Sequence, residues 1–213
     1  MEFSILKNLI KKCKTQQKMT GEEFCELIKK DPSWCLSLKE PIEVTTFVNL
    51  KHSSITHLSP LITFSGLNSG WAASFFGCKN LKVATGTFNG FTSFENSGIE
   101  KIENLNVTED SSEGCSATFS CCKNLTEASG NYKGFVNFES SGVTTIKNLN
   151  IEEGNLYNKK AAFEDCHIKY VPKQYRGNEF EFDTGVKINS ILKDETIKET
   201  INKIKKETNN IEI

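Results

Sequence analysis

Cysteine and histidine are the residues of this chain whose chemistry could support catalysis or metal binding. The sequence holds eight cysteines and three histidines. Cys78, Cys122 and Cys166 recur at a spacing of 44 residues, whereas a zinc site needs ligand pairs two to four residues apart on facing elements. Free cysteine is among the most often buried residue types. We therefore expect these three thiols to form a buried column of small apolar groups, with no metal site.

A catalytic cysteine would need a histidine beside it as a general base. His167 directly follows Cys166, and the side chains of adjacent residues diverge in an extended segment. The chain contains no G-x-S-x-G, P-loop or G-x-G-x-x-G motif. The sequence thus predicts a protein that is not an enzyme and uses no cofactor. A Cys–His pair assembled from distant segments stays open as an alternative.

Hydroxyl and carboxamide side chains also recur, at positions that strand alternation points away from the core. Such groups either form rungs between neighbouring strands or offer hydrogen bonds to a partner. Because they recur at one phase of the repeat, we predict that they form a polar face that binds another protein. The predicted binding residues are Thr85, Thr87, Asn104, Asn106, Ser129, Asn131, Asn148 and Asn150.

Two tandem copies of one unit must position these residues. Residues 70–113 and 114–157 align without a gap, so that Phe75 matches Phe119 and Leu105 matches Leu149. Degenerate copies precede and follow them, from Trp34 and after Lys160. A fixed period of this size is typical of architectures in which each unit buries its apolar edge against the next.

One segment of the unit carries a family resemblance. Ala73–Leu81 spaces alanine, phenylalanine, cysteine and leucine in a pattern that Ala117–Leu125 repeats and Ala161–Cys166 begins again. This pattern resembles the treponemal-type, or BspA-like, leucine-rich repeats, over roughly residues 34–185. The resemblance implies an interaction surface rather than an enzyme. We therefore predict a mainly β repeat solenoid, with leucine-rich-repeat-like coils of about 22 residues, a 44-residue double unit and helical caps at both ends.

Helices are predicted on either side of this solenoid. Residues 2–18 have apolar residues at helical spacing. Thr20 and Glu23 then form a capping-box pattern that begins a second helix, which Asp31-Pro32 ends. The predicted domains are a helical N-terminal cap (1–33), the solenoid (34–188) and a C-terminal helix (189–213).

Charge and hydropathy narrow the function further. The formal net charge is −1 and Arg176 is the only arginine, which argues against a binder of the phosphate backbone. No apolar run reaches the roughly 18–20 residues needed to span a membrane. We predict a cytoplasmic, non-catalytic protein–protein interaction module without a membrane span. It would block its partner by binding, as phage- or mobile-element-type (anti-CRISPR-like) inhibitors do. A Cys–His enzyme and a nucleic-acid-binding repeat protein are the alternatives.

Overall fold

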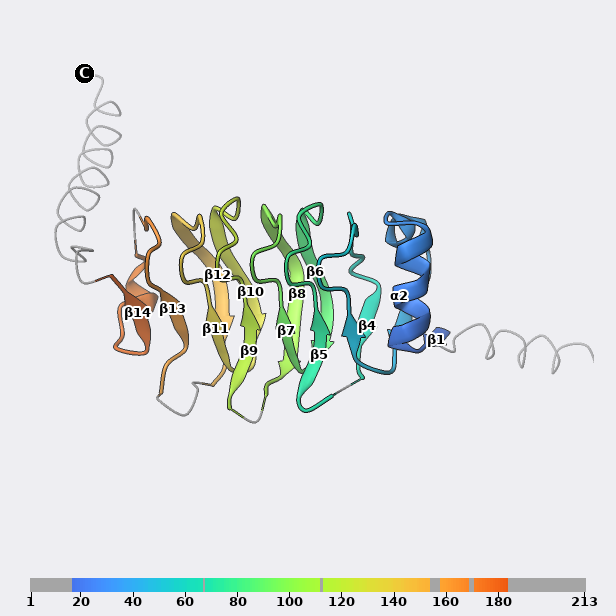
Figure 1. Cartoon of the computed structure of the whole chain (residues 1–213). Coiled ribbons are helices and arrows are strands. Elements are labelled where there is room, and N and C mark those ends of the chain that lie inside the picture. The colour runs from blue at the N-terminus through green and yellow to red at the C-terminus, as the bar shows by residue number, and fades with distance from the viewer. Residues whose placement is uncertain (1–16, 67, 112, 154–157, 169–170, 184–213) are drawn as a thin grey trace, which may run out of the picture.

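The computed structural model describes residues 17–183, apart from residues 67, 112, 154–157 and 169–170. The described residues form two parallel sheets of seven strands each, together with one α-helix. In Figure 1 the strands follow one another along the molecule from the end that carries α2 to the end that carries β14. The predicted helices over residues 2–18 and 189–213 lie almost wholly outside the described residues. The exceptions, Gln17 and Lys18, belong to a strand.

Within each sheet the strands are arranged in the order in which they occur along the chain. The first sheet contains β1 (Gln17–Met19), β2 (Ile42–Val44), β4 (Ile62–Phe64), β6 (Val83–Asn89), β8 (Lys101–Glu109), β10 (Glu127–Tyr132) and β12 (Thr145–Ile151). The second sheet contains β3 (Val48–Asn49), β5 (Trp71–Ser74), β7 (Phe91–Ser93), β9 (Cys115–Thr118), β11 (Phe135–Asn137), β13 (Ala161–Phe163) and β14 (Phe180–Phe182). The helical elements are α2 (Gly21–Lys30) and the short 3-10 helices η1 (Trp34–Ser37) and η2 (Lys173–Tyr175).

Between β2 and β13, successive strands of the chain belong alternately to the two sheets. Within one sheet, the number of residues from one strand to the next, here called a step, alternates between two values. In the second sheet Ala73 pairs with Thr92, 19 residues later, and Thr92 pairs with Ala117, 25 residues later. In the first sheet Thr87 pairs with Asn106 after 19 residues, and Asn106 pairs with Asn131 after 25. The 44-residue period is therefore the sum of two unequal steps.

The predicted fold class is wrong. The described residues form an α/β arrangement of two parallel sheets, and not a mainly β solenoid of leucine-rich-repeat-like coils with helical caps at both ends. The physical reason is that each step contributes a strand to both sheets. Small residues at the start of the repeat pattern, such as Ala73 and Ala117, are fully buried in strands of the second sheet.

The core lies between the sheets and contains a continuous stack of phenylalanine rings. Neighbouring rings lie 5.1–5.3 Å apart with interplanar angles of 5–9°, an offset-stacked geometry that adds to the energy of burial. Side chains of the first sheet meet the stack edge-on, as Phe88 does against Phe94 at 5.9 Å. The stacked residues are Phe75, Phe94, Phe119, Phe138, Phe163 and Phe182.

The helix α2 packs at the N-terminal end of the sheets. The Thr20 hydroxyl accepts a hydrogen bond from Glu23 N (3.1 Å), and the Glu23 carboxylate accepts one from Thr20 N (2.7 Å). Phe24 and Ile28 are buried, and the Asp31 backbone N–H closes the helix by donating to Leu27 O. The capping box and the end of this helix are therefore confirmed.

A tyrosine closes part of the other end of the first sheet. The Tyr175 hydroxyl accepts a hydrogen bond from the Leu149 backbone N–H (3.1 Å) and donates one to the Leu149 carbonyl (2.9 Å). These are the two groups that a next strand would pair. The 3-10 helix η2, which follows Pro172, thus stands beside β12 where the described residues add no further strand.

Candidate functional site

The outer face of the first sheet carries a row of polar side chains in register. The row members are paired strand by strand: Thr63 with Thr87, Thr87 with Asn106, Asn106 with Asn131, and Asn131 with Asn150. Neighbouring parallel strands lie about 4.8 Å apart. The side chains therefore form a ladder of hydroxyl and carboxamide groups, hereafter called the polar row (Thr63, Thr87, Asn106, Asn131 and Asn150).

The polar row is uncharged, and its N-terminal neighbour is neutralised. Glu43 precedes Thr63 in the same register, and its carboxylate pairs with Lys18 Nζ at 2.8 Å and accepts a hydrogen bond from Ser65 Oγ at 2.6 Å. Hydrogen bonds from Lys18 and Ser65 hold the pKa of Glu43 below its ordinary value. At this register the face therefore offers neutral hydrogen-bonding groups between β4 and β12.

A shallow pocket of about 310 Å³ opens along the C-terminal half of the polar row. Asn106, Asn131 and Asn150 form one side of it, and Thr108, Lys133 and Glu152 lie two residues further along the same three segments. Asn150 Nδ2 donates to Asn131 Oδ1 at 2.8 Å. The pocket is thus lined by donors and acceptors of which only part are used internally, which is a geometry that suits a hydrogen-bonding partner.

The structure separates the eight predicted binding residues into three groups. Thr87, Asn106, Asn131 and Asn150 lie side by side in the polar row. Thr85 and Ser129 are buried, and Ser129 Oγ donates to the Ile102 carbonyl at 3.3 Å. They are not part of the exposed row.

Asn104 and Asn148 form the third group. They are exposed but adopt φ values of 50° and 52°, at register shifts where β8 and β12 each carry an extra residue. Asparagine tolerates this left-handed conformation better than most residues. In each Asn-Leu-Asn run, the first asparagine (Asn104 or Asn148) therefore forms the bulge, and the second (Asn106 or Asn150) belongs to the polar row.

Sequence reasoning missed part of the pocket. Thr63 completes the polar row on β4, and Thr108, Lys133 and Glu152 complete the pocket. The signal was present, because residues two apart on a strand share a face. Counting two residues onward from Asn106, Asn131 and Asn150 leads to those three side chains.

The repeated cysteines are buried, as expected, but they do not form a purely apolar column. The Sγ atoms of Cys78, Cys122 and Cys166 donate to backbone carbonyls at 2.9, 3.0 and 3.0 Å. Each Sγ also lies 3.3–3.4 Å from a serine Oγ of the preceding step. Because the serines come from the intervening steps, the column alternates serine and cysteine: Ser53, Cys78, Ser97, Cys122, Ser141 and Cys166.

This environment disfavours the thiolate. Burial raises the pKa of the Cys78, Cys122 and Cys166 thiols, and burial raises the pKa of Cys35 to about 12. A nucleophilic cysteine needs the opposite shift. Within residues 17–183, excluding the gaps, no hydrogen bond joins a histidine to a cysteine, and no cluster of three metal-binding side chains is found. Cys13 lies outside the described residues.

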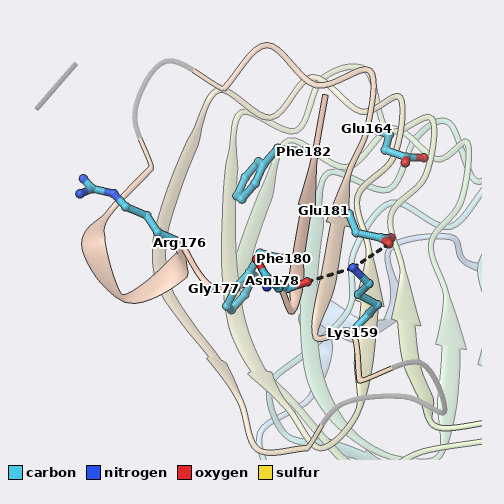
Figure 2. Close-up of a pocket in the computed structure, with 8 residues that line it drawn as sticks. All are labelled: Lys159, Glu164, Arg176, Gly177, Asn178, Phe180, Glu181 and Phe182. Carbon is cyan, nitrogen blue, oxygen red and sulfur yellow. Dashed lines mark hydrogen bonds and ion pairs between the residues drawn. The ribbon is translucent and has the colours of Figure 1, made fainter. Parts of the chain in front are cut away.

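A second pocket, of about 430 Å³, lies at the C-terminal end of the sheets, beside β14. Figure 2 shows Lys159 directed towards Glu181 and the Asn178 backbone, while Arg176 points away from the other lining side chains. Lys159 Nζ pairs with Glu181 Oε1 at 3.2 Å and donates to Asn178 O at 2.9 Å. Lys159 and Glu181 are engaged with each other, and Arg176 Nε donates to the Val171 carbonyl at 3.0 Å, which makes this pocket a weaker candidate than the polar row.

The outer face of the second sheet differs in character. Trp71 is 37% exposed, and its ring packs edge-on against Phe91 with centroids 4.4 Å apart. Phe135 follows on β11 and is half-buried. Ser74 and Ser93, which are paired in the next register, are buried. The polar residues of that register continue on the neighbouring strands as Asn49, Thr118 and Asn137. The side-chain oxygens of Asn49, Ser93, Thr118 and Asn137 accept hydrogen bonds from backbone N–H groups two residues onward, so this face offers fewer unused polar groups than the polar row does.

Comparisons with known proteins leave the geometry as the basis for assigning a function. No protein-family model, curated protein or solved structure matches the chain. In the part of the chain that the structure describes, no helix is long and apolar enough to cross a membrane.

Proposed function

We propose that the protein is a non-catalytic binding module that recognises another protein through the polar row and the pocket beside it. The observation that carries this proposal is the register of five neutral polar side chains over five adjacent strands. A rigid sheet fixes such groups in advance, so that binding loses little side-chain freedom. The raised pKa of the buried thiols supports a role without cysteine catalysis.

The location of the polar row further supports a contact surface. Its residues lie on the face opposite the core. Leu105 and Leu149, which directly precede Asn106 and Asn150 in the sequence, are buried. A polar partner surface could exchange hydrogen bonds with hydroxyl and carboxamide groups without leaving a charge unpaired. The seven free thiols of the described residues support the prediction of a cytoplasmic location. A role as a phage- or mobile-element-type inhibitor stays a prediction.

The experiment that tests this proposal places charges in the polar row. The double variant Asn106→Glu with Asn150→Glu should nearly keep its melting temperature, because Asn150 is exposed, Asn106 is only half-buried, and surface substitutions usually change stability by no more than about 0.5 kcal/mol. It should bind the partner at least about tenfold more weakly, since two carboxylates would lose hydration at a contact where the wild-type side chains are neutral. The partner would first be isolated with the wild-type chain from its native cells, and its Kd measured by calorimetry.

A matched control comes from the repeat itself. Asn80 and Asn124 are exposed, lie 44 residues apart and lie outside the strands, after β5 and β9. The variant Asn80→Glu with Asn124→Glu adds the same charges at a different place and should bind the partner with unchanged Kd. Equal weakening by both variants would mean that net charge, and not the polar row, governs binding, and the proposal would then be wrong.

A further inference from the structure

On the outer edge of β12, the backbone groups of Leu149 are hydrogen-bonded within the described residues, whereas those of Ile151, two residues later, are not. In a parallel strand the N–H and C=O of one residue point to the same side, and those of the following residue point to the opposite side. Glu152 N donates to Tyr132 O at 3.0 Å, towards β10, so the backbone groups of Leu149 and Ile151 point away from β10. The Tyr175 hydroxyl engages those of Leu149. Among the described residues no hydrogen bond engages those of Ile151.

The preceding repeat shows which backbone group pairs with the position of Ile151 when a neighbouring strand is present. Val107 on β8 is the counterpart of Ile151, 44 residues earlier, and the Val107 carbonyl accepts a hydrogen bond from Lys133 N at 3.0 Å. The counterpart of Lys133 in the last copy is Gly177. Gly177 instead belongs to the turn before β14, where its carbonyl accepts a hydrogen bond from Phe180 N at 3.1 Å. The described chain therefore leaves this pairing place empty.

A pocket of about 340 Å³ lies at this edge. It is lined by the end of β12 and Glu152, by Gln174, Tyr175 and Phe180, and by Lys160 and Glu179. Lys160 Nζ lies 3.8 Å from Glu179 Oε1, so these two charges offset each other. Asn150 and Glu152 also line the pocket beside the polar row. The two pockets thus meet at β12, so a partner bound to the outer face could extend a segment along the edge.

The charges at this edge favour a basic segment. In the preceding repeat Lys133 Nζ lies 3.9 Å from Glu109 Oε2 across the strand pair. The counterpart of Glu109 is Glu153, which is exposed, and neighbouring Glu152 is exposed as well. No ion pair in the described residues involves either carboxylate. A lysine or arginine placed like Lys133 would therefore meet an unpaired acid.

We propose that the outer edge of β12 at Leu149–Ile151, with the Glu153 carboxylate beyond its end, is a strand-addition site that takes an extended, basic segment of the partner protein. The segment lies beside β12 as β10 lies beside β8, donates a backbone N–H to the Ile151 carbonyl, and places a lysine or arginine against Glu153. Main-chain pairing of this kind supplies affinity, and the side-chain contacts supply specificity. The inference rests on the proposed role in protein binding, and its test is separable from the test of that role.

The test uses the full chain and a synthetic peptide with the sequence of residues 127–135, EASGNYKGF, as the probe. We expect the peptide to shift the Ile151 amide resonance in ¹⁵N-labelled protein and to slow the hydrogen exchange of that amide at least tenfold. A peptide carrying Lys133→Glu should bind at least tenfold more weakly. The protein variant Glu153→Lys should restore binding of that altered peptide, which a nonspecific contact would not do.

Three results would overturn the proposal. The first is an Ile151 amide already protected from exchange in the free chain, independently of concentration, because a segment of the chain itself would then cover the edge. The second is protection that rises with protein concentration, which would indicate a second copy. The third is an unchanged Ile151 resonance at millimolar peptide. None of these involves the partner or the Asn106 and Asn150 variants, so the outer-face proposal would stand or fall separately.

Discussion

The two sheets are built from the same repeats, yet they contribute different things to the molecule. The second sheet has strands of two to four residues, and the six stacked phenylalanines on its inner side unite the core. The first sheet has strands of up to nine residues and an outer row of neutral polar groups. The comparison indicates that the second sheet mainly provides stability, whereas the first carries the surface proposed for binding.

The largest test of this division removes a ring from the middle of the stack. Phe119→Ala should lower the free energy of unfolding by about 3–5 kcal/mol, because it deletes a fully buried aromatic group and leaves a cavity. Phe182→Ala, at the half-buried end of the stack, should cost at most about half as much. Chemical denaturation measures both. Equal losses at the two positions would show that the stack does not act as the continuous core of the second sheet.

A smaller loss of stability is expected from a change in the buried column of alternating serine and cysteine, which follows the strands of the second sheet. Cys122→Ala should cost about 1.5 kcal/mol, since it removes one of the two hydrogen bonds to the buried Phe94 carbonyl, which keeps only the Ser97 N–H (3.2 Å) as a donor. Cys122→Ser should cost less, because a hydroxyl can replace the thiol as donor and already occupies the neighbouring positions of the column. Thermal unfolding of both variants makes the comparison. If serine proved worse than alanine, the thiol would be acting as an apolar group, as the sequence alone suggested.

The smallest effect distinguishes two asparagines within the first sheet. Asn104→Ala should cost about 1 kcal/mol, because alanine adopts a positive φ less readily than asparagine. Asn104→Gly should be tolerated, and Asn106→Ala should change stability by less than about 0.5 kcal/mol. Urea titration of the three variants measures these differences. Similar losses for the two alanine variants would remove the distinction between bulge and polar row.

The sequence predicts the repeat, the helix α2 and the burial of the main apolar positions, because each of these depends on local pattern. Thr20 and Glu23 interact within one turn of helix, and the matching of Phe75 with Phe119 follows from the period alone. The second sheet was harder to foresee. Ala72, Ala73 and Ser74 on β5 are all buried, so the alternation that marks a strand with one exposed face is absent there.

The candidate site was only partly predictable for a different reason. Asn104 and Asn106 carry the same side chain on either side of Leu105, and simple alternation assigns both to one face. The positive φ of Asn104 breaks that alternation, and it reflects the register between β6 and β8 rather than the residue type. The role of Tyr175 depends likewise on β12, 26 residues earlier in the chain.

Because steps of 19 and 25 residues alternate, a chain of this kind can be lengthened without disturbing its contacts only by a pair of steps, which is 44 residues. Serine and cysteine alternate in the buried column, and the longer step always precedes cysteine. Duplicating a single step would place two like residues in contact and two unlike strand lengths in register. Duplicating 44 residues reproduces every neighbour at once. Gene duplication could therefore extend this chain by pairs of steps, and each added pair would widen the polar row by two strands while leaving both ends unchanged.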